Sequence, residues 1–115
     1  MRIAIPSNGD KGLEERVAYH FGRCPYYTIL DEKGKVVEIK ENTSEHMGGS
    51  GLPPKILKEQ GINILLCRGL GRKAIAFSDR IGLEVQIGER QTVKEIFEEW
   101  KAGNTKKATM ADSCK

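Results

Sequence analysis

The order of apolar and polar positions along the chain predicts several short β-strands. A continuous apolar run is typical of a strand buried on both faces, whereas strict alternation marks a strand with one wetter face. The run at 62–66 is of the first kind, and residues 83–87 alternate. On these patterns we expect five strands, the second and third forming a hairpin: 2–6, 27–30, 36–39, 62–66 and 83–87.

Three helices are predicted from apolar residues spaced three or four apart and from residues that suit helix ends. Pro53 and Pro54 suit the first turn of a helix that Gly61 ends. Gly82 ends the second helix, and Thr92 begins a capping box for the third. The apolar faces of the second and third helices consist of Leu70, Ala74, Phe77 and Ile81, and of Val93, Ile96, Phe97 and Trp100.

The order of these elements predicts an α/β fold. Right-handed crossovers place parallel strands side by side with helices on both faces. We therefore expect a three-layer α/β/α sandwich around a mixed five-stranded sheet, formed by one domain over residues 1–102. Residues 103–115 are polar and aperiodic, and we expect them to form a mobile tail.

Composition narrows the class of protein. The 115 residues carry a net charge of +3 without a basic stripe, which argues against a nucleic-acid partner. No apolar run approaches the roughly 20 residues of a membrane span, so we expect no membrane association and a cytoplasmic location. Three cysteines, an odd number in a chain expected in the cytoplasm, favour free thiols or metal ligands over a disulfide framework.

Three segments carry a family resemblance: HFGRCPYY (20–27), HMGGSG (46–51) and CRGLG (67–71). Together they resemble the dinitrogenase iron–molybdenum cofactor-binding family, over residues 1–102. That family includes small carriers of nitrogenase cofactor precursors and the orange protein, which holds a molybdenum–copper sulfide cluster.

The resemblance has implications for both fold and function. It implies a ribonuclease H-like sheet with strand order 3-2-1-4-5 and an antiparallel second strand. It also implies binding of an iron–sulfur or iron–molybdenum-type cluster by a monomer that receives it from a donor protein and passes it to an acceptor protein.

The soft metal ligands lie in predicted loops or at strand ends. Cys24, His20, His46 and Cys67 are the candidates, because thiolate and imidazole suit a metal–sulfur cluster. Cys24 and His20 rank first, since they share the most family-specific segment, although many relatives have a small non-thiol residue at the position of Cys24. For Cys67 the alternative, a buried thiol that acts as a small hydrophobe, is the commoner case. Cys114 lies in the tail and is either incidental or able to close over a cluster.

Glycines and arginines beside these ligands are candidates for holding an anion. Gly48, Gly49 and Gly51 precede a predicted helix whose N–H groups could face an anionic ligand, and turns that need positive φ are the alternative. We expect the loop 42–51 to be mobile without ligand. The remaining candidates flank the two cysteines and could instead be turn or surface residues: Arg23, Arg68, Gly69 and Gly71.

Other functional classes fit the sequence less well. A nuclease needs several carboxylates around a metal, and Asp31 stands almost alone on the hairpin. A cysteine hydrolase using Cys24 and His20 lacks an orienting third residue, and no nucleotide-binding motif is present. We therefore expect a non-catalytic binder or carrier of a metal–sulfur cluster. The alternative is a regulatory module that binds a small anion or a protein partner without a metal.

Overall fold

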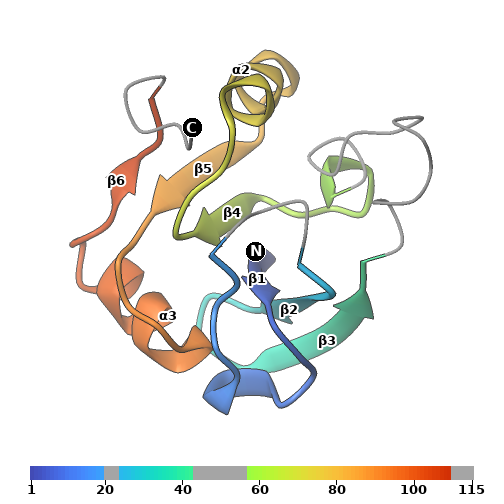
Figure 1. The fold of residues 1–115 in the computed structure, drawn as a ribbon, viewed down its shortest axis with the longest axis vertical. Coiled ribbons are helices and arrows are strands. Elements are labelled where there is room, and N and C mark those ends of the chain that lie inside the picture. The colour runs from blue at the N-terminus through green and yellow to red at the C-terminus, as the bar shows by residue number, and fades with distance from the viewer. Residues whose placement is uncertain (20–23, 43–56, 110–115) are drawn as a thin grey trace.

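The computed structural model describes residues 1–19, 24–42 and 57–109, and these contain one six-stranded sheet in the order β3-β2-β1-β4-β5-β6 (Figure 1). The strands are β1 (Ile3–Ser7), β2 (Tyr26–Leu30), β3 (Val36–Glu41), β4 (Ile64–Cys67), β5 (Glu84–Ile87) and β6 (Lys106–Lys107). The helices are η1 (Gly12–Glu14, a 3-10 helix), α2 (Arg72–Ile81) and α3 (Val93–Lys101). Residues 57–59 are also helical.

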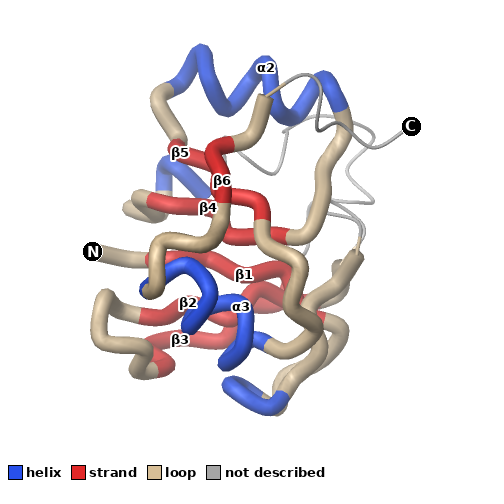
Figure 2. The backbone as a smooth tube through the Cα atoms, turned by 90° about the vertical axis from the view of Figure 1, so that its left-hand side faces the viewer, coloured by secondary structure: helices blue, strands red, loops and turns tan. Residues whose placement is uncertain are grey.

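The strand directions confirm the predicted topology. β1 pairs in parallel with β4 and β4 with β5, whereas β2 runs antiparallel to both β1 and β3. Figure 2 shows β3, β2, β1, β4 and β5 lying one above another in this order. The first five strands therefore have the expected 3-2-1-4-5 order with an antiparallel second strand.

The predicted count of five strands is wrong by one, because β6 pairs antiparallel with β5. Lys106 and Lys107 are both exposed and have no apolar pattern that would indicate a strand. Backbone hydrogen bonds hold these two residues beside β5. The N–H of the next residue, Ala108, likewise donates to the carbonyl of Val85 at 2.9 Å. This strand lies within the segment that the sequence assigned to a tail.

Two apolar cores, one on each face of the sheet, give the predicted three layers. Ala4 and Leu65 pack in the core that contains Leu57 of the 57–59 helical segment and Ile75 of α2. Their neighbours along the strands point to the opposite face, because side chains alternate along a strand. That second core joins the sheet to α3 and η1 through Ile3, Ile5, Ile64, Leu66, Val93, Ile96, Phe97 and Leu13.

The helix ends follow the local sequence signals. Gly82 ends α2 in the left-handed conformation, with φ of 77°. Thr92 caps α3, since its side chain accepts a hydrogen bond from the N–H of Glu95 at 3.2 Å. Both predicted boundaries are therefore confirmed.

Several strands reach one end of the sheet, which we call its carboxyl end. β1, β4 and β5 finish there, and β2 begins there because Tyr26 is opposite Ser7. The segment after η1 joins the same region, where Val17 bridges Ser7 and the N–H of Ala18 donates to Pro6 at 2.8 Å. Ligands of open α/β sheets bind at this end of the strands.

Candidate functional site

The two cysteines among the described residues both lie at the carboxyl end of the sheet. Cys67 is the last residue of β4 and Cys24 is two residues ahead of β2. Both thiols lie in the apolar core on the α2 side. Cys67 is fully buried and Cys24 is 3% exposed. The structure therefore brings two predicted soft ligands to one end and one face of the sheet.

Asn42 positions the backbone at Cys24. It follows β3, and its N–H donates to the carbonyl of Pro25 at 2.8 Å. Its side-chain Nδ2 donates to the carbonyl of Cys24 at 2.8 Å and lies 3.8 Å from the Cys24 sulfur. In the sequence Asn42 begins the segment expected to be a mobile loop, and no local pattern indicates this role. A buried amide directed at a thiol is visible only once the β2–β3 register brings the two residues together.

The start of α2 lies directly beyond the carboxyl end of β4. Gly71 is the N-cap, and no described side chain caps the helix there. The first N–H groups of a helix have no partner within it, so this end attracts anions. Arg72 and Lys73 add exposed positive charge to the same turn. A side-chain Cβ placed on Gly71 would meet nothing within 4 Å, so the space beside this N-cap is open among the described residues.

Arg68 joins this region to the segment after η1. Its guanidinium carbon lies 5.4 Å from the centre of the Tyr19 ring, within the range of a cation–π contact. Tyr19 is 56% exposed, which makes it one of the few large apolar side chains at the described surface. Arg68 is a candidate from the sequence and Tyr19 is not, because a single tyrosine carries no signal of its own. Gly69, also named from the sequence, is buried between Arg68 and Leu70.

The remaining predicted site residues lie outside the described part of the chain: His20, Arg23, His46, Gly48, Gly49 and Gly51. The expected mobility of the loop 42–51 also concerns residues outside it, apart from Asn42. Within residues 1–19, 24–42 and 57–109, no three side chains of His, Cys, Asp or Glu form a group that could hold a metal ion. At the carboxyl end of the sheet the described residues thus offer two thiols, an uncapped helix start and the positive charges of Arg68, Arg72 and Lys73.

The fold and this site define a small α/β protein of a known kind. The chain belongs to the dinitrogenase iron-molybdenum cofactor family, whose sequence model matches residues 1–103.

Individual relatives agree with this assignment. Uncharacterized protein MJ0580 of Methanocaldococcus jannaschii is 28% identical, over 93% of this chain and 91% of its own. The NMR structure of Thermotoga TM1290 is 33% identical with a TM-score of 0.75, and the match covers 92% of this chain and 91% of that one. The apo form of the orange protein from Desulfovibrio gigas is 25% identical with a TM-score of 0.82, covering 94% and 92% respectively. None of the described helices is long and apolar enough to span a membrane.

Proposed function

We propose that this protein binds a metal–sulfur cluster, of the iron–molybdenum cofactor or precursor kind, at the carboxyl end of its sheet and carries it between proteins. The observation that carries the proposal is the meeting of two thiols and a cationic helix start at one end of the sheet, in a chain of this family. The role is non-catalytic. The partners are a donor protein that assembles the cluster and an acceptor protein that receives it.

The chemistry of these groups suits such a cargo. Thiolates are soft ligands that iron and molybdenum sulfides accept, and hydrogen bonds to sulfur tune such clusters. Asn42 directs an N–H toward the Cys24 sulfur, which is the kind of contact that stabilises a metal-bound thiolate. The N–H groups at the start of α2, with Arg68, Arg72 and Lys73, supply the positive potential that an anionic cluster needs.

Burial of both thiols limits how each of them can bind a cluster. Cys67 packs within the core, and the carbonyl of Cys67 accepts a bond from the N–H of Gly88 at 2.9 Å. Cys24 directly follows the chain segment 20–23, which begins with His20. We therefore propose Cys24 as the first thiolate ligand, with His20 and His46 as further ligands and Cys67 as an inner wall of the site.

Anaerobic reconstitution with ferrous iron, sulfide and molybdate tests the proposal. The wild-type protein should give a coloured complex with a fixed ratio of metal to protein, and Cys24→Ser should lose most of it while remaining folded. Cys114→Ser, which changes a tail thiol, is the matched control and should keep the colour. A wild-type protein that stays colourless and metal-free refutes cluster binding, whereas undiminished binding by Cys24→Ser refutes only the choice of ligand.

A second candidate function is a regulatory module that binds a small anion or a protein without a metal. The burial of both described cysteines favours it, because a buried thiol most often acts as a small hydrophobe. This module would show saturable binding of inorganic phosphate or molybdate at the start of α2 and no uptake of iron. Equal responses of wild-type protein and the double variant Cys24→Ser/Cys67→Ser would support it over the cluster carrier.

A further inference from the structure

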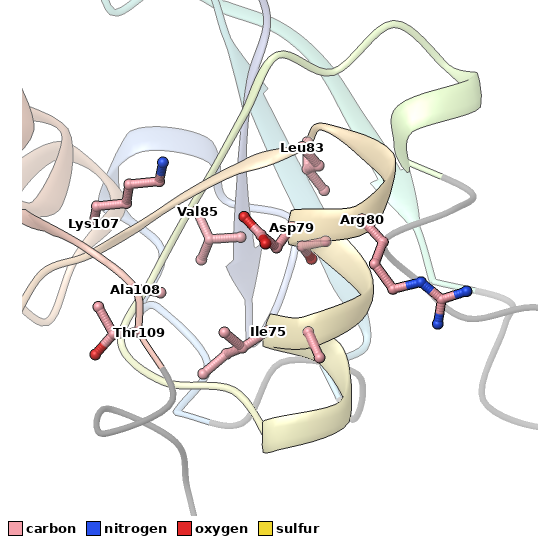
Figure 3. A pocket seen from close by; sticks show the side chains of 10 residues that line it. Ile75, Asp79, Arg80, Leu83, Val85, Lys107, Ala108 and Thr109 are labelled. Atoms are coloured by element: carbon pink, nitrogen blue, oxygen red, sulfur yellow. The ribbon is translucent and has the colours of Figure 1, made fainter.

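A groove unrelated to the carboxyl-end site lies between α2 and the β5–β6 edge of the sheet (Figure 3). We call it the α2–β6 groove. Its volume is about 600 Å³, within the range of roughly 300–1,000 Å³ that small-molecule sites occupy. Its apolar surface comes from both sides of the groove and includes Ile75, Leu83, Val85 and Ala108.

One polar side chain in the wall of this groove lacks a partner. Ser78 is 1% exposed, and its hydroxyl has no hydrogen bond within the described part of the protein. Burying a hydroxyl without a partner is unfavourable by about 1–3 kcal/mol on protein scales. A residue of this kind in the wall of a groove is explained if a bound molecule supplies the missing hydrogen bond.

Charge is distributed unevenly around the same groove. Figure 3 shows the carboxylate of Asp79 projecting from α2 toward Val85, whereas the guanidinium of Arg80 points away from the groove. The ammonium group of Lys107 lies at the end of the groove remote from Ile75. No ion pair or side-chain hydrogen bond of Asp79 occurs among the described residues. The charge that faces the middle of the groove is therefore negative.

We propose that the α2–β6 groove binds a small amphipathic amine. Its hydrocarbon part would cover Ile75, Leu83, Val85 and Ala108, and its ammonium group would meet the carboxylate of Asp79 and the hydroxyl of Ser78. An ammonium group has three donors, so it can bond both oxygens at once. This site is independent of the proposed cluster site, which lies at the carboxyl end of the sheet.

Three six-carbon ligands that differ in their head group test the proposal: hexylamine, hexanol and hexanoate. Each is titrated into isotope-labelled protein while the methyl signals of Ile75, Leu83 and Val85 are followed by NMR. Hexylamine should bind most tightly and shift these signals, and hexanoate should bind most weakly. The proposal would be overturned if hexanoate bound as tightly as hexylamine or more tightly. It would also be overturned if hexylamine bound without shifting these methyl signals.

Two substitutions separate the polar contributions. Asp79→Asn should weaken hexylamine binding about two- to fivefold, as expected of an exposed charge pair, and leave hexanol unaffected. Asp10→Asn, at an exposed aspartate outside the groove, is the matched control and should change neither. Ser78→Ala should raise the melting temperature of the free protein and weaken amine binding. A lower melting temperature would show that the Ser78 hydroxyl already has a partner and would overturn the proposal.

Discussion

Removing the side-chain amide of Asn42 should destabilise the protein measurably. In Asn42→Ala the buried carbonyl of Cys24 loses a bond of 2.8 Å, and the Cys24 sulfur loses the N–H that lies 3.8 Å away. Asn42 is only 7% exposed, so water does not freely replace its amide. Leaving a buried acceptor without its donor costs about 1–3 kcal/mol of unfolding free energy.

Urea unfolding followed by fluorescence measures this loss of unfolding free energy directly, because Trp100 is the single tryptophan of the chain. With a urea dependence of about 1–3 kcal/mol per molar, the midpoint should fall by roughly 1 M. Asn104→Ala is the matched control, since Asn104 is exposed, and its effect should stay within about 0.5 kcal/mol. Equal midpoints for the two variants would show that Asn42 does not hold the backbone at Cys24.

Three further predictions concern the stability of the fold away from the site. Gly34→Ala should lower the unfolding free energy by about 1–3 kcal/mol or more, because Gly34 has φ of 87° and a Cβ there would lie 2.8 Å from the Phe97 ring. Thr92→Ala should cost about 1 kcal/mol through loss of the α3 cap, measured by urea unfolding. Asp31→Asn should flatten the acid limb of the stability curve, because backbone N–H groups, first that of Lys35, lower the pKa of Asp31 below its ordinary value of 3.8.

Each of these three predictions has a defined contrary result. Gly103 has a similar positive φ, 80°, but open space around a new Cβ, so equal losses in Gly103→Ala and Gly34→Ala would refute the Phe97 contact. Unchanged stability in Thr92→Ala would refute the cap. A lowered pKa contributes stability that is present above the unfolded pKa and lost as pH falls through the folded one. The stability curves of wild-type protein and Asp31→Asn should therefore run parallel above about pH 4 and converge below it, and curves that stay parallel over the whole range would refute the Asp31 contribution.

The fold was largely predictable because its elements carry local signals. The apolar run of β4 predicted a central strand, and the glycine at the end of α2 predicted its boundary. β6 was not predictable, since Lys106 and Lys107 enter the sheet through backbone bonds that are independent of side-chain type. The segment around Val17 has no local signal for the same reason, because the bridge to Ser7 and backbone hydrogen bonds to Pro6 and Gln91 place it.

The candidate site was predictable only in part. The position of Cys67 at the end of an apolar strand identified the carboxyl end of the sheet, and the resemblance pointed to Cys24. The contacts that complete the described site join residues far apart in the chain. Asn42 reaches Cys24 across the β2–β3 pair, and Arg68 reaches Tyr19 from the end of β4. Such pairs depend on sheet register, which a single sequence does not encode locally.

The most direct test of the central claim is where on the protein a cluster binds. Amide spectra of isotope-labelled protein are recorded before and after anaerobic reconstitution with iron, sulfide and molybdate. We predict that signals of residues 67–73 and of Cys24 and Tyr26, at the carboxyl end of the sheet, shift or broaden. Signals of residues 33–35, in the hairpin turn at the opposite end, should stay unchanged. Changes confined to 33–35, or no change despite metal uptake, would contradict a cluster site at the carboxyl end of the sheet.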